Sequence, residues 1–146
     1  MSATYVSLYI HIVFSTKNRH PWLTDQFIAR MYDYLGGSLR GLGATSIRVG
    51  GVEDHVHLLV GIKTTHCISD LVRDIKKAST NWMQDELPAF SWQVGYGVFS
   101  VSPERLKGVS KYIDNQVEHH KTMTFVEERI MLYRLAGIDF DPDDLD

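Results

Sequence analysis

The pattern of apolar and polar positions first predicts a buried strand followed by an amphipathic helix. Residues Tyr5–Ser15 are rich in aromatic and β-branched side chains and carry almost no charge, which favours a strand buried on both faces near the centre of a sheet. From Thr24, which suits an N-cap, apolar residues recur at helical spacing as far as Leu42, and Gly41 and Gly43 provide a stop. The chain is therefore predicted to begin as strand, loop and helix.

Two further strands are predicted to form a hairpin. The runs Ser46–Val52 and His55–Ile62 have strand-like composition and meet at the polar residues 53–54. Gly50 and Gly51 lie just before this turn, where glycines often mark a bend or a bulge. The pattern therefore predicts a hairpin whose first strand is irregular near its end.

A second helix and a fourth strand complete the predicted core. Ser69 suits the N-cap of a helix that Pro88 closes, with Lys76 and Lys77 on its solvent side. Trp92–Val101 then has strand-like composition, with two glycines that suggest kinks. The order of strand, helix, strand, strand, helix, strand is typical of a ferredoxin-like, split βαβ sheet.

Two helices follow this core. Pro103 suits the first position of a helix that is predicted to extend to about His119. Residues 124–127 form a capping box, and the helix that they open is predicted to run to Gly137. The predicted fold class is α/β (α+β), a ferredoxin-like four-stranded antiparallel sheet with an added C-terminal helix that carries Tyr112.

Length and composition indicate one globular domain over residues 1–146. The chain is 44% apolar and 23% charged, which is ordinary for such a fold. Residues Met1–Thr4 lack the features of a signal peptide, and no apolar run is long enough to span a bilayer. The single cysteine, Cys67, cannot form an intramolecular disulfide, so a cytoplasmic location is expected.

The net charge of −3 counts against nucleic-acid binding until its distribution is considered. Five acidic residues lie within residues 139–146, so residues 1–138 carry 15 basic and 13 acidic side chains, a net of +2. The body of the chain is therefore nearly neutral. Residues 139–146 are predicted to be a flexible, solvated acidic tail.

Two histidines and a tyrosine–glutamine pair supply candidate chemistry. His55 and His57 stand two residues apart on a predicted strand, so both side chains point to one face and could share a divalent metal. Tyr112 and Gln116 stand four residues apart on a predicted helix, where Gln116 could complete the metal ligands. A tyrosine beside a metal-bound phosphate can attack phosphorus. Taken separately, these residues also fit hydrogen-bonded histidines and an ordinary helix surface.

Several segments, in this order, resemble the single-tyrosine HUH transposases of small insertion sequences (the TnpA type) and their relatives that act on genomic palindromes. Residues 9–19 (YIHIVFSTKNR) resemble the family's first strand and its basic exit, and residues 51–60 (GVEDHVHLLV) resemble its histidine motif. Residues 92–102 (WQVGYGVFSVS) resemble the strand before the tyrosine helix, and residues 111–116 (KYIDNQ) resemble that helix. The resemblance extends from about Tyr5 to His120.

This resemblance implies a DNA transposase that cuts and rejoins single-stranded DNA at sites flanked by hairpins. Tyr112 would be the nucleophile that keeps the 5′ phosphate as a phosphotyrosine, and His55, His57 and Gln116 would bind Mg²⁺ or Mn²⁺. The family works as a homodimer, in which the tyrosine helix of one subunit can complete the site of the other. Two histidines are unusual ligands for magnesium, so the metal is implied by the chemistry and the family.

Basic side chains near predicted loops and exposed helix faces are candidates for contacts with the DNA backbone. The loop from Lys17 to Arg19 is the first choice, because it leaves the central strand with a basic residue at each end. Trp22, Trp92 and Tyr96 could stack on bases. The DNA-binding candidates are Lys17, Arg19, Lys63, Lys76, Lys77, Arg105 and Lys111, with Arg73 and Lys107 as further basic residues.

Other polar residues are assigned lesser roles. His11, in the first strand, could face the metal site as a supporting residue or be hydrogen-bonded in the core. Glu53 and Asp54 are expected to be exposed in their turn, although either could orient an imidazole. The pairs 66–67 (His-Cys) and 119–120 (His-His) are expected to be structural or solvated, because adjacent helix residues point in different directions.

Three other functions stay open on the sequence. A ferredoxin-like sheet with surface aromatics also describes non-catalytic RNA-recognition domains. A metal-binding or oligomeric regulatory protein would need the histidines but no DNA. A domesticated nuclease that processes palindromic repeats would keep the chemistry and lose mobility. The sequence has no glycine-rich loop with lysine for nucleotide phosphates, so an enzyme driven by a nucleoside triphosphate is not expected.

Overall fold

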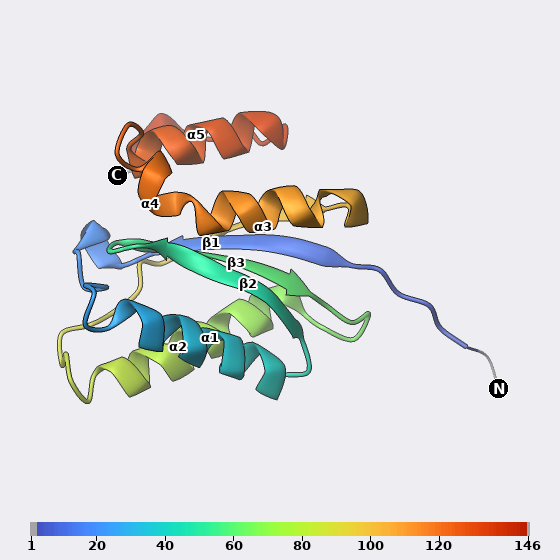
Figure 1. Ribbon diagram of the computed structural model, residues 1–146, viewed down its shortest axis with the longest axis horizontal. Helices are drawn as coiled ribbons and strands as arrows, with labels where there is room; N and C mark the ends of the chain where they lie inside the picture. The colour runs from blue at the N-terminus through green and yellow to red at the C-terminus, as the bar shows by residue number, and fades with distance from the viewer. Residues whose placement is uncertain (1–2, 146) are drawn as a thin grey trace.

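A four-stranded antiparallel sheet with the strand order β2-β3-β1-β4 forms the middle layer of the protein, whose computed structural model describes residues 3–145 (Figure 1). This is the order of a ferredoxin-like split βαβ sheet, so the predicted fold class is confirmed. Met1 and Ser2, part of the N-terminal stretch considered above for a signal peptide, lie outside the described residues. The strands are β1 (Tyr9–Ser15), β2 (Thr45–Val52), β3 (His55–Gly61) and β4 (Gly97–Val101).

Helices cover both faces of this sheet. Helices α1 (Ile28–Gly41) and α2 (Ile68–Met83) lie on one face, and α3 (Leu106–Asp114), α4 (Gln116–His119) and α5 (Phe125–Leu135) lie over the other (Figure 1). Short 3₁₀ turns occupy Lys17–Arg19, Pro103–Arg105 and Pro142–Leu145. Within the described residues, no helix is both long and apolar enough to cross a membrane.

The two faces of β3 carry different chemistry. Val56, Leu58 and Val60 pack into the apolar core beneath α1 and α2, whereas His55 and His57 point to the opposite face, because side chains alternate along a strand. Both histidines are fully buried. A strand buried on both faces therefore delivers two imidazoles into the layer between the sheet and the C-terminal helices.

Several predicted boundaries were wrong. β1 begins at Tyr9 rather than Tyr5. Helix α1 begins at Ile28, after a turn in which the Thr24 carbonyl accepts from the amides of Phe27 and Ile28. The second helix begins at Ile68, so Ser69 lies inside it. These ends depend on tertiary contacts and capping geometry, which residue spacing does not specify.

The segment 92–96 is not part of β4. Trp92 forms an isolated bridge with Thr16, is buried, and donates its indole N–H to Ser79 Oγ at 2.9 Å. Lys76, expected to face solvent, instead donates from Nζ to the carbonyls of Gln93 and Gly95 at 2.9 and 2.6 Å. These bonds tie the segment to α2, and burial lowers the Lys76 pKa to about 8. Of the predicted strand 92–101, residues Gly97–Val101 form the ladder with β1.

The predicted helix from Pro103 to His119 is divided into a 3₁₀ turn, α3 and α4. Asn115 separates the last two with φ −95° and ψ 15°. The Asn115 amide still donates to the Lys111 carbonyl at 3.0 Å, so the chain keeps a helical course through the break. Tyr112 and Gln116 consequently remain on the same side.

The expected acidic tail makes contacts with α5. Residues Pro142–Leu145 form a 3₁₀ turn, Leu145 is buried, and Arg129 Nη2 donates to the Leu145 carbonyl. Asp146 lies outside the described residues. Leu145 is an apolar residue within the acidic run, and its burial is not revealed by charge composition.

At Gly50 the tyrosine helix packs closely on β2. The bulge expected near Gly50 and Gly51 lies instead between Ser46 and Arg48, and Gly50 pairs regularly with His57. A Cβ atom at Gly50 would lie 2.7 Å from Ile113 Cγ2 and 2.8 Å from the Ile113 carbonyl oxygen. The glycine therefore permits α3 to pack directly on the strand.

Replacing Gly50 by alanine is expected to reduce the free energy of unfolding by about 1–3 kcal/mol, because the new methyl group overlaps Ile113 and pushes α3 outward. Urea denaturation would measure the change. Gly41→Ala is the matched control, since an added Cβ there meets no heavy atom within 4 Å. Equal stability of the two variants would contradict the close approach.

Candidate metal and tyrosine site

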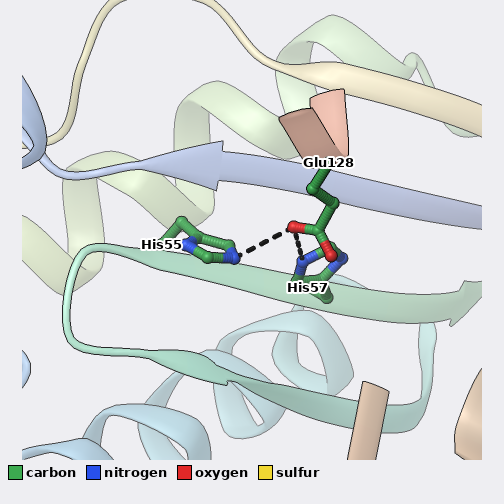
Figure 2. Close-up of side chains that lie close together, drawn as sticks. All are labelled: His55, His57 and Glu128. Carbon is green, nitrogen blue, oxygen red and sulfur yellow. Dashed lines mark hydrogen bonds and ion pairs between the residues drawn. The ribbon is translucent and has the colours of Figure 1, made fainter. Parts of the chain in front are cut away.

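The centre of the site is a carboxylate held by the two histidines of β3. Glu128 of α5 points down toward the sheet, and its Oε1 lies 3.2 Å from His55 Nε2 and 3.1 Å from His57 Nε2 (Figure 2). All three side chains are fully buried. Their ligand atoms lie within 4.8 Å of one another. Two imidazole nitrogens and a carboxylate oxygen at this spacing suit a divalent metal ion, and the carboxylate adds an oxygen ligand that hard ions prefer.

Two residues of the α4 region approach the same carboxylate. Gln116 Oε1 lies 3.0 Å from His55 Nε2, so this predicted ligand is next to the histidine pair. His120 Nε2 lies 3.1 Å from both Gln116 Oε1 and Glu128 Oε1. His120 is thus hydrogen-bonded beside the site rather than solvated, in keeping with the structural of the two roles expected for it. His119 points elsewhere, with its ring 4.8 Å from the Tyr112 ring.

Tyr112 reaches this cluster from α3 of the same chain. Its hydroxyl donates to Glu128 Oε2, and the Gln116 amide donates to the same oxygen at 2.7 Å. The centroid of the Tyr112 ring lies 5.8 Å from that of His57. The Glu128 carboxylate therefore bridges the two groups: Oε2 contacts the tyrosine, and Oε1 contacts the two histidines. Within one chain, the tyrosine, the glutamine and both histidines already meet.

The far nitrogens of both histidines are also held. Asp54 Oδ1 lies 2.7 Å from His55 Nδ1, so Asp54 is not the exposed turn residue that was expected. His11 Nε2 lies 2.8 Å from His57 Nδ1, which places His11 beside the site. Such outer hydrogen bonds fix the ring orientation of a metal-binding imidazole. Here they direct both Nε2 atoms toward Glu128.

The sequence matches the family model described as "Transposase IS200 like" over residues 4–116. The chain belongs to the IS200-like transposase family. It is 27% identical over 114 residues to the ISDra2 transposase TnpA of Deinococcus radiodurans, which covers 73% of this chain and 81% of that protein. The matched region includes the histidines, the tyrosine and the glutamine, whereas His120 and Glu128 lie beyond it.

Solved structures have the same fold. One, named as a transposase from Deinococcus radiodurans R1, is 29% identical, covers 80% of this chain and 96% of its own, and has a TM-score of 0.64. Another, a REP-associated tyrosine transposase bound to a REP hairpin, is 17% identical, covers 82% and 74%, and has a TM-score of 0.60. The family assignment made from the sequence is confirmed.

Burial and hydrogen bonding set the charges in this transposase site. Burial alone would lower the His55 pKa, but Asp54 and Glu128 outweigh it and raise that pKa to about 9. For His57, burial prevails and lowers the pKa. Burial also opposes ionisation of Glu128, yet hydrogen bonds from His55 and His57 hold its pKa well below the ordinary value. The site therefore holds a charged His55–Glu128 pair beside a neutral His57.

The tyrosine and the outer histidine are held in their neutral forms. Burial, followed by the adjacent Glu128 carboxylate, raises the Tyr112 pKa, so its hydroxyl keeps the proton that it donates. Burial and the neighbouring His57 lower the His11 pKa to about 3. His11 is therefore a neutral hydrogen-bonding partner of His57 at physiological pH.

Metal binding by the transposase is expected to weaken as the pH falls below about 9. His55 holds a proton below its pKa of about 9, and a metal ion needs the unprotonated Nε2, so apparent affinity should fall about tenfold per pH unit for the one proton released. Calorimetric titration with Mn²⁺ in two buffers of different ionisation enthalpy measures both the affinity and the number of protons released. Affinity that does not change between about pH 6 and pH 8 would contradict this charge assignment.

The basic candidates do not form one group. Arg19 is half-buried and lines a cavity of about 430 Å³ together with His120 and Lys121, at the edge of the site. The Lys76 ammonium group already donates hydrogen bonds to the backbone carbonyls of Gln93 and Gly95. Trp92 is a core residue and cannot stack on a base. The exposed basic candidates are Lys17, Lys63, Lys77, Arg105 and Lys111.

Sequence reasoning missed Glu128 altogether. The capping box was found correctly, because the Thr124 side chain accepts from the Glu127 amide and Glu127 accepts from the Thr124 amide. The next residue, Glu128, looks like one more acidic residue of a first helical turn. Its complete burial was the decisive property, and a lone charged residue gives no such signal in the sequence.

Proposed function

We propose that this chain is a single-tyrosine transposase that cuts and rejoins single-stranded DNA through a covalent 5′-phosphotyrosine at Tyr112. The observation that carries the proposal is the convergence of Tyr112, Gln116, His55 and His57 on the two oxygens of Glu128. A core tyrosine with only a structural role would not require two buried imidazoles and a buried carboxylate around its hydroxyl.

In the proposed reaction, Tyr112 Oη attacks the phosphorus of a DNA phosphodiester and the bond from phosphorus to the 3′ oxygen breaks. The 3′ oxygen leaves with the proton that Tyr112 gives up, so a free 3′ hydroxyl forms. Glu128 Oε2 already accepts the Tyr112 proton in a hydrogen bond, so it is positioned to receive that proton as the phosphotyrosine forms. Reversal of the step by a 3′ hydroxyl rejoins the strand. The number of ester bonds is conserved, so ATP is not needed.

His55, His57 and Glu128, with Gln116 beside them, would hold the metal ion, which we propose to be Mg²⁺ or Mn²⁺. A divalent ion in this position would stabilise negative charge on the phosphate and on the departing oxygen. Asp54 and His11 would keep the two imidazoles aimed at the site through their outer nitrogens. The chain's own side chains thus supply the nucleophile, the proton acceptor and the ligands.

The proposed DNA substrate is a single strand that carries a hairpin beside the cleavage site. A solved structure with this fold is named as bound to a REP hairpin. Arg19 and Lys121 line the polar cavity next to His120, where they could contact backbone phosphates. A homodimer remains part of the proposal, although the tyrosine site here is built within one chain.

The test uses purified protein and a labelled single-stranded hairpin DNA from its own genomic flanks. With Mn²⁺ or Mg²⁺, a protein–DNA adduct that survives denaturation is expected, and a chelator should abolish it. Tight DNA binding without any adduct would favour the non-catalytic binding module instead. Cleavage without rejoining of a flanking strand would favour the palindrome-processing nuclease.

A further inference from the structure

A second cavity lies beside Tyr112, between β4, α3 and α5. Its volume is about 360 Å³, which is within the range of sites for small ligands. The walls are mostly apolar, and they include the tyrosine ring itself. The lining residues used below are His11, Phe99, Arg105, Gly108, Tyr112 and Met131. No step of the proposed chemistry uses this space.

Three rings from three different elements form one side of this cavity. His11 of β1 pairs directly with Phe99 of β4, and their ring centroids lie 5.8 Å apart. The Tyr112 ring of α3 lies 6.3 Å from the His11 ring. Phe99 is only partly buried and lines the cavity. Aromatic side chains grouped in this way are platforms on which nucleic-acid bases stack.

We propose that this cavity receives an unpaired nucleobase from the nucleotide next to the phosphate that Tyr112 attacks. The inference rests on the proposed function, because it takes Tyr112 as the nucleophile. Tyr112 belongs to both the catalytic cluster and the cavity wall. The cavity therefore adjoins the residue that would attack the phosphate, so a nucleotide joined to that phosphate would lie close to the cavity.

The charge of the cavity favours a nucleotide over an apolar side chain of another protein. Arg105 is exposed and lines the same space, so a guanidinium is available to the backbone phosphates of a strand whose base enters. Two half-buried aromatic residues, Phe99 and Tyr112, offer ring surface for stacking. The combination of a cationic rim and an aromatic wall is typical of sites that hold single-stranded nucleic acid.

Gly108 allows the cavity to be filled without disturbing the fold. It lies on α3 and lines the cavity, and an added Cβ there would meet no heavy atom within 4 Å. A Gly108→Leu side chain should occupy the space and also favour the helix. Gly41→Leu is the matched control, because Gly41 is also open to a Cβ and ends α1, on the other face of the sheet.

The measurement is the NMR shift of methyl-labelled methionine during titration with each deoxynucleoside monophosphate. Met131 lines the cavity, whereas the buried Met31 and Met83 lie in the core on the opposite face and serve as references. Deoxyribose phosphate without a base is the ligand control. We expect Met131 to shift with base-bearing ligands only, and binding to weaken about tenfold or more in Gly108→Leu but not in Gly41→Leu.

Other outcomes overturn the inference. If deoxyribose phosphate moves Met131 equally, if no nucleotide moves it, or if Gly108→Leu retains the response, the cavity is not a base site. A Met131 shift that depends on protein concentration alone would identify a second copy of the chain as the occupant instead. The adduct assay separates these results from failure of the proposed function. Adduct formation tests Tyr112 and the metal directly, and its result does not depend on the nucleotide titration.

Discussion

Replacing Tyr112 by phenylalanine is expected to abolish the covalent protein–DNA adduct and to reduce strand cleavage by on the order of 10⁴-fold or more. The hydroxyl is the atom that would attack phosphorus, and among the described residues no other tyrosine hydroxyl forms a hydrogen bond with Glu128. The aromatic ring is retained, so packing against His11, His57 and His119 should be preserved. The measurement is adduct yield on a denaturing gel, with strand cleavage followed over time.

Tyr32→Phe is the matched control for this variant. Tyr32 is also half-buried, but it lies on α1, on the other face of the sheet. Loss of the Tyr32 hydroxyl should leave adduct formation unchanged. Both variants should bind Mn²⁺ as the unmodified protein does. An adduct that persists in Tyr112→Phe would assign the nucleophile to another residue and would refute the proposed mechanism.

Replacing Glu128 by glutamine is expected to weaken Mn²⁺ binding by at least about tenfold and to lower adduct formation. The change removes the only carboxylate from the group of His55, His57 and Glu128 that could hold a metal. It also leaves the His55 imidazolium with Asp54 as its remaining acidic partner. Because Asp54 remains, we expect a loss of stability below the ~3–5 kcal/mol typical of breaking an isolated buried ion pair.

Calorimetry with Mn²⁺ alone, without DNA, separates the ligand role from catalysis. Glu118→Gln is the control, since Glu118 is an exposed residue of α4 that pairs with Lys121 at 2.8 Å. Tighter Mn²⁺ binding by Glu128→Gln would show that the carboxylate competes with the metal rather than binding it. Unchanged binding would assign the metal to the histidines and Gln116.

The local sequence patterns were sufficient for the order of the elements and for the shared faces of the two histidines and of the tyrosine–glutamine pair. Alternation along His55–Gly61 placed both histidines on one face, and the four-residue spacing of Tyr112 and Gln116 placed them together despite the break at Asn115. Both predictions depend only on backbone periodicity, which survives small irregularities. The family resemblance added the roles that periodicity alone left open.

Boundary errors arose where long-range contacts override local preference. The strand-like composition of segment 92–96 favoured pairing with β1, but Lys76 and Ser79 of α2 bind that segment instead. The contact of Leu145 with Arg129 of α5 is likewise a long-range contact. Residue spacing carries no information on such partners.

The sequence by itself determined the ferredoxin-like order of strands and helices, the histidine pair, and the tyrosine and glutamine on one helical face. Only the tertiary structure showed that Glu128, His120, Asp54 and His11 surround that pair. The physical reason is that periodicity is a property of neighbouring residues, whereas a buried polar cluster is built from distant residues that must satisfy one another's hydrogen bonds. The complete site is therefore a product of packing α5 onto the sheet.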